Sequence, residues 1–118
     1  MIEGSCHCGP IRFVLNSEPD WLSVCNCSLC RRIAGRWAAA DTSAVEVSVE
    51  GDALNSYEHG DRTLRMHSCR HCGCTTHYTP TDPAVTRMKV NLAMAEPDAI
   101  AHYRIRHFDG ADTWTYLD

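Results

Sequence analysis

Apolar and polar residues alternate along several short segments of the chain. Residues 11–16, "IRFVLN", and residues 45–49, "VEVSV", each place three apolar side chains on one face and polar or smaller side chains on the other. A period of two is typical of a half-buried β-strand. Similar patterns, bounded by glycine and proline turns, predict further strands at residues 21–27, on both sides of a turn at 58–61, and at 62–68, 75–79, 84–94 and 102–108.

Only two segments favour a helix. In residues 28–35, "SLCRRIAG", Ser28 is the predicted N-cap and Gly35 lies where a glycine would end a short helix. Residues 96–100, "EPDAI", predict a single helical turn. A chain of 118 residues has the size of one domain. We therefore predict a single mainly β domain over residues 1–118, with stacked antiparallel sheets and one short helix after the cysteine cluster at 25–30.

Eight cysteines gather in three clusters, at residues 6–8, 25–30 and 69–74. The first ten residues, "MIEGSCHCGP", lack the basic and apolar stretches of a signal peptide, and no apolar run approaches the roughly 20 residues that span a bilayer. We therefore expect a soluble, cytoplasmic protein without a membrane partner. Thiols in that compartment stay reduced, so the clusters indicate metal binding, and a small exported disulfide scaffold is the weaker alternative.

The charge of the chain argues against one class of partner. The formal net charge is −4, and Lys89 is the single lysine among eleven basic residues. Binding to nucleic acid depends on many phosphate contacts from lysine and arginine. We therefore expect no nucleic-acid partner, and the sequence gives no indication of the oligomeric state.

Two of the cysteine pairs together supply four sulfur ligands. Cys6 and Cys8 are two residues apart, so on an extended backbone both thiols point to one face. Cys69 and Cys72, followed by Gly73, have the spacing of a zinc knuckle. Four thiolates complete a structural tetrahedral zinc, and this site would join segments about 60 residues apart.

The remaining cysteines leave two alternatives open. Cys25, Cys27 and Cys30 are three ligands within reach of one ion, and three protein ligands with a free fourth position are typical of a catalytic zinc. Cys74 is either a small buried residue of the hairpin or a fourth ligand of this second ion. In the latter case both ions are structural, and the protein is a non-catalytic zinc module whose surface serves a protein partner.

The order of these motifs resembles a known family. "GSCHCG", "CNCSLCRRIAG", "SCRHCGC", "VNLAM" and "IRHFDG" are similar to segments of the glutathione-dependent formaldehyde-activating enzymes, a family that also contains a centromere protein. The resemblance implies a β-rich fold with two zinc ions and a carbon–sulfur lyase that joins glutathione to formaldehyde as S-hydroxymethylglutathione. It also implies a structural site at Cys6, Cys8, Cys69 and Cys72 and a catalytic site at Cys25, Cys27 and Cys30.

A zinc ion held by three thiolates suits thiol chemistry. It is a poor Lewis acid and is better at holding an incoming thiol as thiolate than at activating water. We expect glutathione or a related small thiol, together with a small aldehyde, as partners. The candidate residues for binding them are Arg31, Arg32, Arg36 and Trp37. The arginines would hold the carboxylates of glutathione or only balance a thiolate-rich surface, and Trp37 would form a pocket wall or belong to the core.

Other side chains that could carry chemistry have simpler expectations. His67 and His77 flank the late knuckle and could act as acid–base groups, but we expect them on a strand surface. Trp21 and Trp114 are expected in the core.

Overall fold

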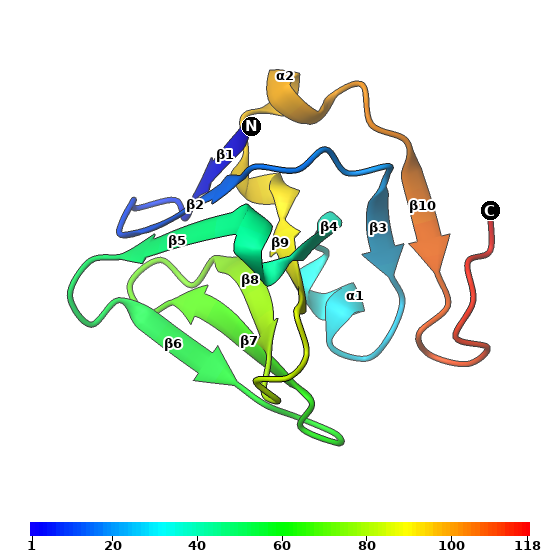
Figure 1. Cartoon of the computed structure of the whole chain (residues 1–118). Helices are drawn as coiled ribbons and strands as arrows, with labels where there is room; N and C mark the ends of the chain where they lie inside the picture. Colours follow the sequence, from blue (N-terminus) through cyan, green and yellow to red (C-terminus); the bar gives the residue numbers. More distant parts are fainter.

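Ten strands form two sheets in the computed structural model, which describes all residues from Met1 to Asp118 (Figure 1). The smaller sheet is antiparallel and has the order β1-β2-β5, with β1 at Ile2–Ser5, β2 at Ile11–Leu15 and β5 at Val45–Val49. The larger sheet has the order β10-β3-β4-β9-β8-β7-β6. Its strands are β3 (Leu22–Cys25), β4 (Trp37–Asp41), β6 (Leu54–Tyr57), β7 (Leu64–Cys69), β8 (Thr75–Pro80), β9 (Arg87–Asn91) and β10 (Ile105–Phe108). The predicted mainly β fold is confirmed, although β10 pairs parallel to β3.

The helices are single turns. They are α1 (Cys30–Ile33), α2 (Pro97–Ile100) and two 3₁₀ turns, η1 (Thr42–Ala44) and η2 (Leu92–Met94). None of them has the length or the apolar character that crossing a bilayer requires. The prediction of a short helix after the 25–30 cluster is confirmed, but the N-cap assigned to Ser28 is wrong, because Leu29 precedes the helix and no side chain caps it.

The end of α1 explains the glycine at position 35. Ala34 adopts the left-handed conformation that closes the helix, with φ of 57°. Gly35 is required for a different reason, because a Cβ atom there would lie 2.8 Å from the indole ring of Trp37. Real Cβ atoms do not approach other atoms this closely, so the chain turns from α1 into β4 only with glycine at this position.

The main core lies between the two sheets. The predicted alternation of β2 is confirmed, since Ile11, Phe13 and Leu15 are at most 1% exposed. Phe13 covers Gly4 of the neighbouring strand so closely that no side chain fits there. Phe13 and Leu15 meet the buried face of the larger sheet, and the core cluster consists of Ile2, Phe13, Leu15, Leu22, Ala38, Met88, Val90, Leu92 and Ile100. Burial of this apolar surface is the main force that joins the sheets.

Two strands escaped the sequence pattern, β1 and β4. Residues 37–41, "WAAAD", contain no β-branched residue, yet β4 lies in the middle of the larger sheet between β3 and β9. Ala38 is fully buried there. Small side chains allow the second layer to pack closely on this strand, and tertiary packing outweighs the weak strand preference of alanine.

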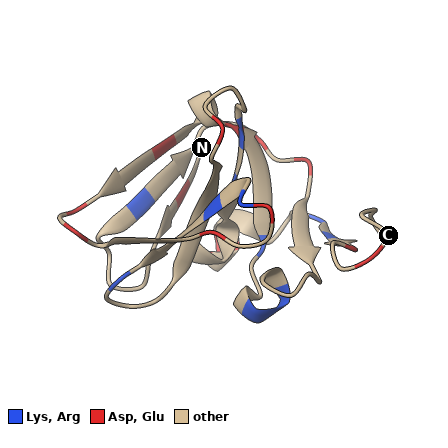
Figure 2. Cartoon of the chain, turned by 90° about the horizontal axis from the view of Figure 1, so that it is seen from below, with Lys and Arg blue, Asp and Glu red and all other residues tan.

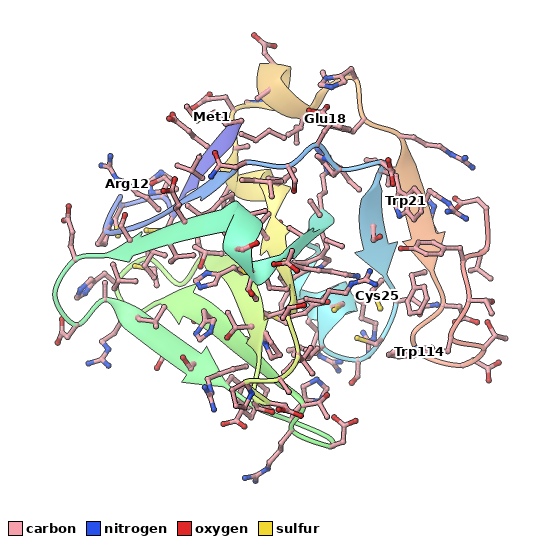
Figure 3. All side chains as sticks on the ribbon, viewed as in Figure 1. Met1, Arg12, Glu18, Trp21, Cys25 and Trp114 are labelled. Atoms are coloured by element: carbon pink, nitrogen blue, oxygen red, sulfur yellow. The ribbon has the colours of Figure 1, made fainter.

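Residues 109–118 fold back along β10 and end beside it, on the side away from β3 (Figure 1). The guanidinium of Arg106 lies between the rings of Trp21 and Tyr116, 4.5 and 4.2 Å from their centroids, and donates two hydrogen bonds to the main-chain oxygen of Asp118. Trp114 is 71% exposed, so its expected place in the core is wrong. Figure 3 shows this tryptophan in the C-terminal loop below Cys25, at the end of β3.

Candidate metal centres

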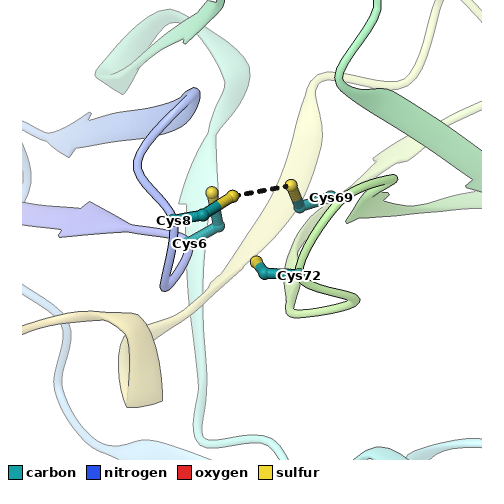
Figure 4. Close-up of side chains that lie close together, drawn as sticks. All are labelled: Cys6, Cys8, Cys69 and Cys72. Atoms are coloured by element: carbon teal, nitrogen blue, oxygen red, sulfur yellow. Dashed lines mark hydrogen bonds between the residues drawn. The ribbon is translucent and has the colours of Figure 1, made fainter.

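Four cysteines from distant parts of the chain meet at the first cluster (Figure 4). Cys6 and Cys8 follow β1, Cys69 ends β7, and Cys72 lies in the turn that leads to β8. Their sulfur atoms all lie within 4.8 Å of one another. The expected extended backbone at residues 6–8 is wrong. The chain turns here, with the amide of Gly9 donating to the carbonyl of Cys6 at 3.2 Å, and this turn brings both thiols to the hairpin.

The backbone around the first cluster favours negative charge on sulfur. The amide of Ile11 donates to the sulfur of Cys6 at 3.4 Å. Burial raises the pKa of Cys72, but hydrogen bonds from the main-chain amides of Cys74 and Cys8 and from neighbouring thiols outweigh it, and the pKa falls to about 5. The thiolate is the form that binds metal. This cluster therefore holds a thiolate near neutral pH even before a cation arrives.

The donor set of the first cluster fits tetrahedral zinc. A Zn–S distance of about 2.3 Å places neighbouring sulfur atoms about 3.8 Å apart, which lies inside the observed limit. All eight cysteines are free thiols. Cys6 and Cys69 are 2% exposed and pack with Ile11 and Ala53 in a small apolar cluster. An ion held here would join the smaller sheet to the β7–β8 hairpin of the larger one.

Three cysteines form the second cluster. Cys25 ends β3, Cys27 lies in the following loop, and Cys30 begins α1. Their sulfur atoms also lie within 4.8 Å of one another, and each residue is partly exposed. The amide of Cys30 donates to the sulfur of Cys27 at 3.3 Å. The three sulfurs fit three positions of a tetrahedral zinc site and leave a fourth without a protein ligand.

The pKa values of the thiols in the second cluster shift in different directions. Burial raises the pKa of Cys30, and the neighbouring thiols Cys27 and Cys25 raise it further. Burial also acts on Cys27, but the main-chain amides of Cys30 and Leu29 and the two neighbouring thiols lower its pKa overall. Negative charge in this cluster therefore resides first on Cys27, which lies between the other two ligands in sequence.

Cys74 lies at the first cluster. It packs with Cys6, Cys69 and Cys72, and the main-chain amide of His7 points at its sulfur. The group of mutually close sulfurs at 25–30 has three members and does not include Cys74. This placement speaks against the alternative in which Cys74 closes the second site.

The loop between the cysteines of the second cluster is tied to the C-terminal segment. The side chain of Asn26 donates to Asp109 at 2.9 Å and accepts the amide of Ala111 at 3.0 Å. Asp109 also accepts two hydrogen bonds from Thr113, and these donors lower the pKa of its carboxyl group. A Cβ atom on Gly110 would lie 2.6 Å from the sulfur of Cys25, so glycine is needed for this contact. The "DG" pair at 109–110 signals only a turn in the sequence, so its role at this cluster could not be deduced from it.

The sheet behind the second cluster supplies a cation that sequence reasoning missed. Lys89 on β9 pairs across the sheet with Tyr78 and Ala39, and it makes no ion pair or side-chain hydrogen bond. Burial lowers the pKa of Lys89, although the nearby groups Tyr116, Cys25 and Cys30 act in the opposite direction. Burial and the charge of Cys30 raise the pKa of Tyr78. The signal in the sequence was the single lysine, at a position where a strand should be half-buried.

The four candidate binding residues have different surroundings. Arg31 lines a cavity of about 500 Å³ beside Cys25 and Cys30. Arg32 donates to the carbonyl of Ser28 at 2.6 Å, and Arg36 is exposed. Trp37 is 2% exposed, packs on Tyr78 and is not among the residues that line the cavity, and its Nε1 lacks a hydrogen-bond partner. Figure 2 shows the basic residues of α1 at one end of the molecule, and both signs of charge spread over the rest of the ribbon.

The two histidines of the β7–β8 hairpin are buried, so their expected surface position is wrong. His67 and His77 are 6% and 3% exposed, and their rings stack 4.5 Å apart. His67 bonds to Ser56 and Thr79, and His77 bonds to the hydroxyl of Thr76. Burial lowers the pKa of His77 to about 4. These residues are a neutral part of the sheet and lie apart from the cavity.

Comparison with known proteins agrees with the motifs and the geometry. The model of the family described as "Glutathione-dependent formaldehyde-activating enzyme" matches residues 1–108. The chain belongs to this family. Residues 109–118, which carry Gly110 and the partners of Asn26, lie outside the matched range.

One relative carries the name of this family, and one solved structure has a similar fold. A protein of Halomonas elongata, provisionally named a glutathione-dependent formaldehyde-activating enzyme, is 34% identical over 77 residues. The match covers 64% of this chain but only 45% of that protein, so the chain spans less than half the length of this relative. A crystal structure of a Rhodobacter sphaeroides protein has a TM-score of 0.71 and 29% identity, and the match covers 88% of this chain and 99% of that one.

Proposed function

We propose that the chain is a zinc-dependent carbon–sulfur lyase that forms and cleaves the adduct of glutathione, or a related small thiol, with a small aldehyde. Family membership supports the enzyme class and the two reactants. The proposal includes two zinc ions, a structural one at Cys6, Cys8, Cys69 and Cys72 and a catalytic one at Cys25, Cys27 and Cys30. The cytoplasm as the location belongs to the same proposal.

One observation carries the proposal. The two clusters differ in ligand number and in access, because four sulfurs meet at the first and three at the second, where Cys25 and Cys30 lie in the wall of a cavity. Cys25, Cys27 and Cys30 would hold a zinc ion with three ligands, which leaves one coordination position for a substrate thiol. Such an ion would supply the charge that holds this thiol as its thiolate.

The residues around the second cluster have roles in binding and positioning. Arg31 is the best placed of the three arginines to hold a carboxylate of the thiol with two hydrogen bonds, because it alone lines the cavity. Lys89 adds a positive charge behind the sulfurs and offsets the negative charge of three thiolates. Asn26 fixes the loop that carries the ligands through its bonds to Asp109 and Ala111.

The reaction consumes no further reagent. The thiol sulfur bonds to the carbonyl carbon, the electron pair of the C=O π bond moves to oxygen, and the proton released by the thiol ends on that oxygen. The reverse reaction breaks the same carbon–sulfur bond. The chain therefore needs to hold two reactants in contact and to keep the sulfur deprotonated, which is catalysis by proximity and by a lowered pKa.

A non-catalytic zinc module is the second candidate function. Its requirement was a fourth thiolate from Cys74 at the second ion, and the position of Cys74 beside Cys72 gives this candidate no support. We therefore do not favour it.

The test compares two matched serine variants in zinc-loaded protein. We expect the wild type and Cys74→Ser to speed the approach of glutathione and formaldehyde to their adduct, measured by NMR exchange after subtraction of the uncatalysed rate. We expect Cys30→Ser to lose this acceleration and one zinc ion per chain. An unchanged rate in Cys30→Ser, or after complete removal of metal, would overturn the proposal.

A further inference from the structure

The cavity beside the second cluster is much larger than formaldehyde requires. It is a partly open site with a volume of about 500 Å³, which falls in the range of sites that bind whole small molecules, whereas a molecule the size of water fills about 30 Å³. Two of the three cysteines, Cys25 and Cys30, line it, so the cavity adjoins the proposed reaction site. A reactant with only two heavy atoms leaves most of this space to something else.

The wall of the cavity is apolar. Val24 of β3, Ala34 after α1, Phe108 of β10 and Leu117 of the C-terminal segment line it. Phe108 is itself held by edge contacts to Trp114 and Tyr116, with centroids 5.1 Å away in both cases. Because these rings fix its orientation, the apolar wall is a built feature of the fold.

The polar groups in the wall are largely used by the protein itself. The side chain of Asn26 is bonded to Asp109 and Ala111. His107 and Asp118 bond to each other at 2.6 Å, and the amide of His107 also donates to Asp118. Arg31 has no ion-pair or side-chain hydrogen-bond partner. A ligand in this cavity thus meets sulfur, hydrocarbon and one free guanidinium.

This chemistry does not suit the peptide part of glutathione. Its two amides would lose their hydrogen bonds to water against Val24, Phe108 and Leu117 without finding new partners, which is unfavourable. A hydrocarbon chain or ring gains free energy on entering the same space. The peptide is better accommodated at the solvent-exposed rim of the cavity, with a carboxylate on Arg31.

We propose that the preferred aldehyde of this chain carries a hydrocarbon group of several carbons, and that this group occupies the cavity formed by Val24, Ala34, Phe108 and Leu117. This inference rests on the proposed function and names its substrate class. Leu117 belongs to the segment outside the family match, whereas Val24, Ala34 and Phe108 lie inside it. The reaction stays the same, with the thiol sulfur adding to the carbonyl carbon and its proton ending on oxygen.

The first experiment measures binding with two stable thioethers, S-methylglutathione and S-hexylglutathione, by calorimetry on zinc-loaded protein. The two compounds differ only in the length of the alkyl group, so the ratio of their affinities measures the contribution of the cavity to binding. We expect the hexyl compound to bind at least about tenfold more tightly, since each buried methylene contributes about 0.8 kcal/mol and about two of them account for a tenfold difference. Equal affinities would overturn the inference.

Two leucine variants locate the effect. Leu117 is 64% exposed and Leu64, on β7 and outside the cavity, is 41% exposed, so serine at either position leaves the core intact. We expect Leu117→Ser to reduce the preference for the hexyl compound several-fold and Leu64→Ser to leave it unchanged. A preference that is unaffected by Leu117→Ser, or reduced equally by both variants, counts against the proposed cavity.

The second experiment separates this inference from the function on which it rests. The rate of adduct formation with glutathione is measured for formaldehyde and for hexanal, each relative to its uncatalysed rate. A larger acceleration with hexanal supports the inference. Acceleration with formaldehyde alone overturns the inference and leaves the proposed function standing. No acceleration with either aldehyde, combined with selective binding of the hexyl thioether, overturns the function but leaves the apolar binding site.

Discussion

The two cysteine clusters use the same ligand in opposite ways. The first collects four sulfurs from segments about 60 residues apart, and two of its members are almost completely buried. The second takes three sulfurs from six consecutive residues, leaves all of them partly exposed and borders a cavity. Long sequence separation and burial stabilise a fold, whereas a short, open loop leaves room for a reactant. The proposed division into a structural and a reactive metal site therefore agrees with the topology as well as with the number of sulfur ligands.

The sharpest test of this contrast removes a ligand from the first cluster. We expect Cys72→Ser to lose cooperative folding, because metal binding at such a site contributes directly to folding free energy and the smaller sheet is joined to the hairpin there. Circular dichroism during heating and the zinc content per chain measure this effect. A well-folded Cys72→Ser protein with one zinc would show that the first cluster is dispensable for the fold.

The matching change in the second cluster should spare the fold. We expect Cys30→Ser to remain folded, with a melting temperature within a few degrees of the wild type, because it is partly exposed and its cluster closes only a short loop. Its activity in adduct formation should be abolished. If the two serine variants lost similar stability, the division of roles between the clusters would be wrong.

The hairpin that carries half of the first cluster should make stability dependent on pH. The pKa of His77 is about 4 in the folded chain and about 6.5 when unfolded, so the unfolded state binds more protons between these values. Stability is therefore fully present above pH 6.5, and about 3 kcal/mol is lost as pH falls to 4.

Loss of metal also lowers the stability of the protein in acid, so the contribution of His77 is measured against a variant. His77→Gln keeps a polar side chain but cannot gain the proton, and we expect its unfolding free energy, measured in urea, to fall less steeply with acid than that of the wild type. Parallel curves for the two proteins would show that protonation of His77 does not control the acid response.

A smaller effect is expected from the bond that ties the second cluster to the C-terminal segment. Asn26→Ala removes the hydrogen bonds to Asp109 and Ala111, each contributing about 1 kcal/mol. We expect zinc affinity at the second cluster to fall several-fold in a competition with a chelator, while the fold is retained. Asn55→Ala on the exposed strand β6 is the control and should leave the affinity unchanged.

The smallest expected effect distinguishes two arginines of similar exposure. Arg31 lines the cavity and Arg36 does not. We expect Arg31→Ala to raise the KM for the thiol about two- to threefold without a comparable change in kcat, since an exposed ion pair contributes about 0.5 kcal/mol. Arg36→Ala should behave like the wild type, and equal effects would remove Arg31 from its proposed role.

The sequence predicted what depends on local pattern and on cysteine spacing. Alternation identified β2 and β5, and the spacing of CxC and CxxC predicted the four sulfurs that converge at the first cluster. Prediction from the sequence failed where contacts with distant segments determine whether a residue lies in a strand or is buried. β4 is a strand because β3 and β9 flank it, and His67 and His77 are buried because their strands lie inside the sheet.

The residues of the candidate site divide in the same way, into those that the sequence reveals and those that it does not. Cys25, Cys27 and Cys30 were evident from their spacing, whereas Asn26, Lys89 and Gly110 were not. Each of the last three acts through a partner that is about 60 residues or more away along the chain, at Asp109, at Cys25 and Cys30, and at Cys25 respectively. No local pattern encodes such contacts, so only the tertiary structure could reveal them.

The difference in sequence span also sets an order of assembly. All ligands of the second cluster lie within residues 25–30, so they leave the ribosome together, whereas the first cluster is incomplete until residue 72 has been made. The three ligands of the second cluster are therefore all present on the nascent chain before the first cluster has its fourth. The ligand set proposed to do chemistry is thus synthesised first, and the ligand set proposed to hold the fold is completed last.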